Sequence, residues 1–279
     1  MLQIVDTTLR DGEQKAGIAL NSCEKIAIAK ILDYIGVDQI EAGTPVMGGT
    51  ERAAIEQIVE LGLKSRISAW NRLHPRDIQT SIDCGVDIVH ISVPASDLHI
   101  FQKLNQSRPW VIDKMKFCID LAVSQDTVVH IGLEDASRAD MEFLLELSRI
   151  AKCEGAERVR YADTVGVLTP TKTFFDLGRL TKSIPLEWGI HVHNDFGMAV
   201  ANTLAGIEAG VEYVDCTIGG VGERTGNCNL SNLLIALKQT MRYSKPVKAV
   251  HRRLIETEEE ILDIFYNRRS ISAKTLSFA

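Results

Sequence analysis

Apolar and polar residues alternate along most of the chain with two different periods. Short apolar runs predict β-strands, and between them apolar positions recur every three to four residues, as on one face of a helix. The predicted strands lie at residues 3–8, 39–42, 66–70, 88–93, 128–133, 158–162, 190–193 and 213–218. The predicted helices lie at residues 21–36, 51–61, 76–84, 109–124, 138–153, 171–182, 198–209 and 230–241.

This order makes eight strand–helix units, which predicts an α/β protein with parallel strands and right-handed connections. Helix after helix reaches a glycine just before the next strand, the usual signal of a helix end. Eight units in about 240 residues fit a closed (β/α)8 TIM barrel. An open doubly wound sheet is the alternative, and it is disfavoured because no GxGxxG sequence follows the first strand.

The pattern changes after about residue 243. Lys245 and Pro246 interrupt the chain, residues 247–265 predict one more helix, and the polar tail at 267–279 is expected to be extended. We therefore divide the chain into a barrel domain at residues 1–243 and a C-terminal helix and tail at residues 244–279. The expected fold is a TIM barrel with a short C-terminal helical extension.

The composition restricts the class of protein. The 279 residues are 45% hydrophobic and 24% charged, which is enough apolar material for one large core. The net charge of -6, without basic runs, argues against nucleic-acid binding and against anionic membranes. We see no secretion signal and no apolar run of about 20 residues, so we expect a cytoplasmic protein whose six scattered cysteines are reduced.

Polar side chains gather where the predicted strands end, which is where TIM barrels carry their chemistry. They include Asp6, Arg10, Asp11, Glu41, His130, Glu134, Asp163, Thr164, His191, His193, Asp195 and Thr217. We expect these side chains to surround one site at the mouth of the barrel.

His191 and His193 are two positions apart on a strand, so both imidazoles point the same way. Two hydrogen-bonded core histidines would also fit the spacing. With Asp195 next to them and Asp11 on the first strand, we favour a site for a divalent metal ion. Two histidines and a carboxylate suit Zn, Mn, Fe or Co, and added amide or water oxygens would allow Mg.

Three further features have ordinary interpretations. The glycine-rich stretch at 219–226 lacks GK[ST] and is either a flexible loop or a loop that brings backbone N–H groups to an anion. His90 is expected to be packed on its strand. His99 is expected to lie on the surface.

Three motifs together resemble the signatures of the DRE-TIM metallolyases, the family of the 2-isopropylmalate, homocitrate and citramalate synthases. They are DTTLRDGEQ at 6–14, HVHND at 191–195 and GERTGN at 222–227. The sequences EAGTP at 41–45 and EDASR at 134–138 are most similar to the homocitrate synthase of nitrogen-fixing bacteria.

The resemblance implies a role for each matched position. The metal ligands would be Asp11, His191, His193 and Asn227. Arg10 and Glu134 would be catalytic, with Arg10 stabilising the developing oxyanion. The substrate pocket would be lined by Gln14, Glu41, His130 and Thr164. The implied reaction is a metal-dependent condensation of acetyl-CoA with a 2-oxo acid, 2-oxoglutarate being favoured because its product is homocitrate.

Two departures from the family leave alternatives open. Nothing after residue 243 resembles the segment that carries a catalytic histidine in the longer synthases, so a second synthase subunit is expected to supply it, in a homo-oligomer or hetero-oligomer. Strand five offers His130, Gly132 and Glu134 where lysine-pathway homocitrate synthases carry an arginine for the distal carboxylate. The alternatives are a barrel-only lyase or aldolase, against which GERTGN argues, and a non-catalytic assembly subunit.

Overall fold

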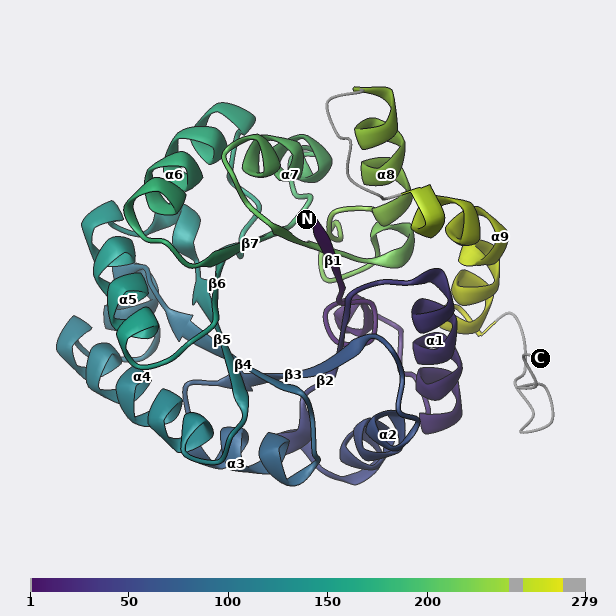
Figure 1. Ribbon diagram of the computed structural model, residues 1–279, viewed down its shortest axis with the longest axis horizontal. Helices are drawn as coiled ribbons and strands as arrows, with labels where there is room; N and C mark the ends of the chain where they lie inside the picture. The colour runs from purple at the N-terminus through teal and green to yellow at the C-terminus, as the bar shows by residue number, and fades with distance from the viewer. Residues whose placement is uncertain (1, 241–247, 268–279) are drawn as a thin grey trace.

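The computed structural model describes residues 2–240 and 248–267 and shows a closed barrel of eight parallel strands in sequence order (Figure 1). The strands are β1 Gln3–Asp6, β2 Gln39–Gly43, β3 Arg66–Arg72, β4 Ile88–Pro94, β5 Val128–Glu134, β6 Arg158–Asp163, β7 Glu187–Val192 and β8 Tyr213–Cys216. The barrel closes where Gln3 of β1 pairs with Tyr213 of β8. The predicted (β/α)8 fold is therefore confirmed.

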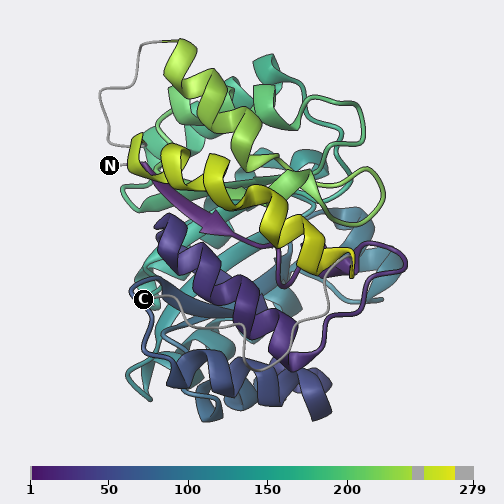
Figure 2. The same ribbon diagram turned by 90° about the vertical axis from the view of Figure 1, so that its right-hand side faces the viewer.

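A ring of helices covers the outside of the barrel (Figure 1). They are α1 Ser22–Ile35, α2 Gly49–Glu60, α3 Pro75–Asp83, α4 Arg108–Val123, α5 Met141–Cys153, α6 Pro170–Ser183, α7 Ala199–Glu208, α8 Leu230–Gln239 and α9 Lys248–Phe265. Short 3-10 turns lie at Gly12–Gln14, Pro45–Met47, Ala136–Arg138 and Ile218–Gly220. Helix α9 is the expected C-terminal extension and packs beside α1 and α8 (Figure 2).

The alternation along each strand divides apolar from polar residues. On β4 and β5, Val89, Ile91 and Ile131 belong to the apolar core between the strands and the helices. The intervening His90 and Gly132 face the interior of the barrel, where they line a pocket. Because successive strand residues point to opposite sides, this pattern places the apolar core outside the barrel and polar chemistry inside it.

Local sequence signals set several helix ends as predicted. The side chain of Asn21 accepts a hydrogen bond from the Glu24 N–H, and the Glu24 side chain accepts from the Asn21 N–H, which is a complete capping box. Gly36 ends α1 with φ at 92°, a conformation that favours glycine. The boundary proposed at 243/244 and nearly all of the 267–279 tail lie outside the described residues.

One element was not predicted. A π-helix at Leu98–Lys103 follows β4, in a stretch between two expected elements. It turns His99 and Lys103 toward the carboxyl ends of the strands. None of the helices in the described part of the chain combines the length and the apolar character that a membrane span requires.

A buried lysine of α1 forms ion pairs with carboxylates of the loop after β1 and of α2. Lys25 of α1 is 1% exposed, and its Nζ lies 2.6 Å from Glu13 Oε2 and also contacts Glu51. We predict that Lys25→Met lowers the free energy of unfolding by about 2–4 kcal/mol, because it leaves two neighbouring carboxylates without their cation. Urea unfolding followed by circular dichroism measures this. Lys64→Met, at an exposed position, is the control and should change the midpoint little.

Candidate active site

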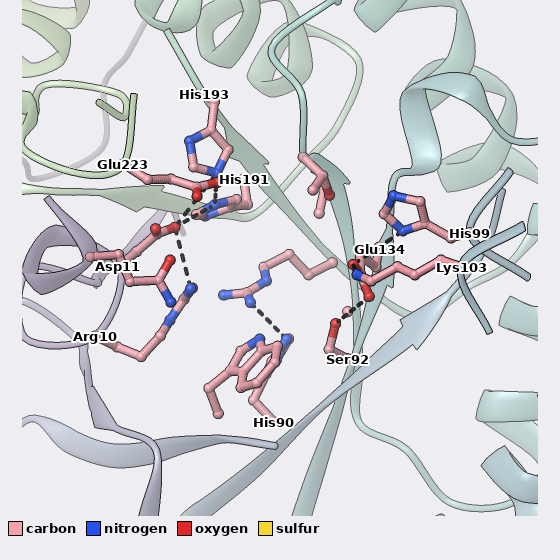
Figure 3. A pocket seen from close by; sticks show the side chains of 16 residues that line it. Arg10, Asp11, His90, Ser92, His99, Lys103, Glu134, His191, His193 and Glu223 are labelled. Atoms are coloured by element: carbon pink, nitrogen blue, oxygen red, sulfur yellow. Dashed lines mark hydrogen bonds and ion pairs between the residues drawn. The ribbon is translucent and has the colours of Figure 1, made fainter. Parts of the chain in front are cut away.

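The carboxyl ends of the strands open into a pocket of about 420 Å³. Its lining residues come from, or directly follow, every strand except β2. Figure 3 shows Asp11, His191 and His193 pointing toward one another on one side, and Glu134, His99 and Lys103 on the other. Strand ends far apart in the sequence therefore meet at one pocket, as expected for this fold.

Asp11, His191 and His193 form a compact set of potential metal ligands. Asp11 Oδ2 lies 2.9 Å from His191 Nε2 and 3.7 Å from His193 Nε2, and the two Nε2 atoms are 3.3 Å apart. Ligands bound about 2.1 Å from a common ion lie roughly 3.0–3.4 Å apart at octahedral or tetrahedral angles. Two of the three spacings are close to this range, and a shift of about 0.3 Å would bring Asp11 and His193 into it, so the set can close around a divalent cation.

Unpaired buried atoms support the same interpretation. Among the described residues, Oδ1 of Asp11 and Oδ1 of Asn227 are buried and accept no hydrogen bond, whereas Asp11 Oδ2 faces His191 and Arg10. Asn227 stands beside His193, with which it forms an isolated β-bridge, and its Nδ2 donates to Val221 O. A cation is the simplest partner for such oxygens, because unpaired buried polar atoms are costly. Asn227 fits the predicted fourth ligand.

The glycine loop shapes this corner of the site. Gly222 has φ at 154°, and a Cβ there would lie 2.1 Å from Asn227 Nδ2. A side chain at this position would therefore displace the amide. The loop has at least one structural reason for its glycines, and the predicted anion-binding role stays a prediction.

Neighbouring charges and burial shift the pKa values of the three triad residues. Burial would raise the pKa of Asp11, but Arg10 and His191 outweigh it and hold that pKa well below its ordinary value. Burial lowers the pKa of His193 to about 4, and the neighbouring His191 adds to the effect. Burial would lower the pKa of His191, but Asp11 and Asp215 outweigh it and raise that pKa, so a cation bound at Nε2 would displace a proton while Nδ1 stays 3.0 Å from Asp215 Oδ2. An ionised carboxylate and accessible Nε2 atoms are the forms that bind metals.

A closed ring of six charged or titratable side chains lies at the base of the site. In order, its members are Asp11, His191, Asp215, Arg160, Glu41 and Arg10. Arg160 Nη1 contacts Asp215 and lies 3.1 Å from Glu41 Oε2. Arg10 closes the ring, with Nε 2.5 Å from Glu41 Oε1 and Nη1 3.4 Å from Asp11 Oδ2. The ring couples the position of Arg10 to that of the metal triad.

The opposite wall carries a second carboxylate. Glu134 Oε1 lies 3.1 Å from His99 Nδ1 and 3.2 Å from Lys103 Nζ, and Ser92 Oγ is 3.5 Å from Oε2. Burial would raise the pKa of Glu134, but His99 and Lys103 outweigh it and lower that pKa. The expectation that His99 lies on the surface is wrong, because its side chain is only 13% exposed and the π-helix turns it inward.

The structure separates the predicted substrate residues into two groups. Gln14 and Thr164 line the pocket, as do the predicted catalytic residues Arg10 and Glu134. Glu41 is fully buried behind Arg10 and does not line it. His130 does not line it either. It lies two residues before Gly132 on β5, a full layer deeper, against a narrow cavity below the pocket.

Sequence reasoning missed Arg160, Asp215 and the position of His90. Arg160 and His90 line the pocket, and Asp215 holds both Arg160 and His191. A usable signal existed for Arg160, since charged residues at alternate positions of a buried strand are uncommon in an α/β barrel. His90 is packed as expected, but its ring also forms part of the pocket floor.

Comparisons with known proteins agree with this arrangement. A family model described as HMGL-like matches residues 1–261. The chain is 49% identical over 263 residues to homocitrate synthase subunit alpha of Clostridium pasteurianum, a match that covers 94% of this chain and 97% of that protein. It is 50% identical over 235 residues to 2-isopropylmalate synthase 2 of Caldanaerobacter subterraneus subsp. tengcongensis, covering 84% of this chain and 61% of the synthase.

The fold also matches solved structures. Hydroxymethylglutaryl-CoA lyase from Pseudomonas aeruginosa superposes with a TM-score of 0.81, covering 98% of this chain and 95% of the lyase. Its sequence identity is 20%, so the likeness establishes the barrel and no more.

Proposed function

The chain belongs to the HMGL-like family, the DRE-TIM metallolyases that its motifs resemble, and from this membership we propose a metal-dependent condensation of acetyl-CoA with a 2-oxo acid. It is a condensing enzyme of the acyltransferase type, since its synthase relatives are 49% and 50% identical. The observation that carries the proposal is the convergence of Asp11, His191 and His193 beside Arg10.

We assign the roles in the site from its geometry. Asp11, His191, His193 and Asn227 would hold the cation, which when bound supplies Lewis-acid polarisation of the substrate carbonyl. Arg10 is fixed by Glu41 and faces the pocket, so its guanidinium can stabilise the oxygen that becomes negative as the new carbon–carbon bond forms. This donor set suits Zn, Mn or Mg, and also Fe or Co.

Glu134 is placed to take part in proton transfer. Its lowered pKa keeps the carboxylate ionised, and it lines both the main pocket and an adjoining cavity. We propose that it accepts a proton from the methyl group of acetyl-CoA, whose carbanion then attacks the 2-oxo carbon. Hydrolysis of the thioester by water would release CoA and leave the carboxylate product.

The adjoining cavity suits the rest of the acyl donor. It has a volume of about 640 Å³ and shares Trp70, Ser92, Lys103 and Glu134 with the main pocket. Arg72 and Arg76 add positive charge for the phosphates of CoA, and Trp110 adds a ring that is 36% exposed. We propose that the thioester arm crosses from this cavity to Glu134.

We further propose that the acceptor is 2-oxoglutarate and the product homocitrate. In this proposal the chain acts together with a second subunit. The support is the Clostridium pasteurianum relative, whose name is homocitrate synthase subunit alpha and whose length this chain nearly matches. The chain spans less than two thirds of the 2-isopropylmalate synthase, whose remaining length is where a further catalytic segment would lie.

A thiol-release assay tests the proposal. The protein, loaded with Zn, Mn or Mg and supplied with the product of a neighbouring synthase-subunit gene, is given acetyl-CoA and a panel of 2-oxo acids. We expect CoA release to be fastest with 2-oxoglutarate. Equal inactivity toward every 2-oxo acid, with the second subunit present and metal bound, would refute a condensing function and favour an assembly role.

A further inference from the structure

The floor of the main pocket carries a cation that the reaction chemistry described above does not use. Arg160 comes from β6, is 7% exposed and lines the pocket beside Gly132, its partner in the β5–β6 register. Strand five itself supplies no cation to the pocket, because its interior residues are His130, Gly132 and Glu134. The cation at this part of the pocket floor therefore comes from β6 and not from β5.

Several hydrogen bonds hold Arg160 in place, but they do not use all of its N–H groups. Its Nη1 donates to Glu41 and Asp215, and its Nη2 lies 2.7 Å from His90 Nε2. Its Nε is buried and donates to no described residue. A guanidinium has five N–H groups, and because Nε is buried, the donor left for an incoming anion is the second N–H of Nη2, whose other N–H faces His90.

Gly132 has no side chain and so leaves room for the His90 ring beside Arg160. A Cβ at Gly132 would lie 2.4 Å from His90 Nε2 and 3.7 Å from Arg160 Nε. Any side chain at position 132 would therefore displace His90, and with it the guanidinium of Arg160 that donates to His90, from the floor of the pocket. Burial, followed by Arg160 itself, lowers the pKa of His90 well below its ordinary value, so the imidazole is neutral and accepts from Arg160.

The position of Arg160 relative to the metal triad suggests its ligand. Arg160 and His191 share one carboxylate, Asp215, so the guanidinium and the triad are separated by only that side chain and an imidazole. A 2-oxo acid bound at the triad would extend its carbon chain across this short distance. Among the described residues, Arg10 and Lys103 also line the pocket, but Arg10 is paired with Glu41 beside the triad, and Lys103 is 61% exposed and paired with Glu134.

We propose that Arg160 is the specificity-determining residue, binding the distal carboxylate of a dicarboxylic 2-oxo acid at the pocket floor. The inference rests on the proposed function and narrows its substrate class. Charge-assisted bonds from a buried guanidinium are strong, and a monocarboxylic 2-oxo acid would leave them unmade. The pocket therefore selects dicarboxylic over branched apolar 2-oxo acids.

Titration calorimetry on the metal-loaded protein tests this without requiring turnover. The probes are 2-oxoglutarate and 2-oxoisovalerate, and the variant is Arg160→Gln, which removes the charge and keeps a polar amide. We expect 2-oxoglutarate affinity to fall at least ~30-fold, the loss typical of a buried charged pair, with 2-oxoisovalerate affinity changed little. Arg149→Gln, at an exposed position on α5 away from the pocket, is the matched control and should change the ratio of the two affinities less than ~3-fold.

Gly132→Ala provides a second variant, which retains Arg160 but displaces it. It should also lower 2-oxoglutarate affinity selectively, and it decides the matter if Arg160→Gln does not fold. Equal loss of both 2-oxo acids in the variants, or a wild type that binds 2-oxoisovalerate more tightly, would overturn the inference. Selective binding of 2-oxoglutarate, without CoA release in the thiol-release assay, would support the role of Arg160 in binding and refute the condensing reaction.

Discussion

Replacing His193 with alanine is expected to strip the protein of its metal ion while leaving the barrel folded. The Nε2 atoms of His191 and His193 are 3.3 Å apart and both approach Asp11 Oδ2, so each would be one of few ligands to a single ion. Loss of a direct ligand should cost more than the roughly 10–100-fold in affinity that loss of a ligand's supporting partner costs. Elemental analysis after gel filtration, with competition against a chromophoric chelator, measures the loss.

Two comparisons make that result specific. Asp11→Ala should lose metal to the same extent, because its carboxylate supplies the third atom of the cluster. His74→Ala removes a histidine whose side chain is 59% exposed outside the cluster and should keep a full complement of metal. Circular dichroism should show an unchanged helix content in each. A His193→Ala protein with undiminished metal would disprove the ligand assignment.

The sequence predicted that Asp11, His191 and His193 meet at one site, because a barrel makes strand ends converge. Asp11 follows β1 and His191 ends β7, and the topology brings them within 2.9 Å although 180 positions separate them. No tertiary detail was needed, since a period of two fixes which side His191 and His193 share. The same reasoning located Glu134 and Thr164 at the pocket wall.

The sequence did not predict the positions of residues that are set by depth inside the barrel or by irregular backbone structure. His130 and Glu134 point into the barrel alike, and only the register of the finished barrel shows that His130 lies a layer below the pocket. His99 is turned inward by a π-helix, which has no periodic signature in this sequence. Arg160 is held by carboxylates from two other strands, Glu41 and Asp215, and that contact exists only once the barrel closes.

Replacing Arg10 with glutamine is expected to lower kcat for CoA release by about 100–1,000-fold, the loss typical of removing an oxyanion-stabilising donor. Asp11 and Glu41 outweigh the effect of burial and raise the pKa of Arg10, so the group that is lost is a permanent cation facing the pocket. Bound metal should stay at the wild-type level, because Arg10 is no ligand. Steady-state kinetics with saturating 2-oxo acid, beside elemental analysis, measure both quantities.

The accompanying variants separate charge from geometry. Arg66→Gln, at an exposed position where β3 begins, removes a positive charge at the other end of the barrel and should leave kcat unchanged. Arg10→Lys keeps the charge but cannot reproduce the Nε bond to Glu41, so we expect roughly a 10-fold loss. A raised KM with unchanged kcat in Arg10→Gln would mean that Arg10 binds substrate and transition state equally. Full activity in Arg10→Lys would mean that charge alone suffices, and that the ring through Glu41 serves folding rather than the reaction.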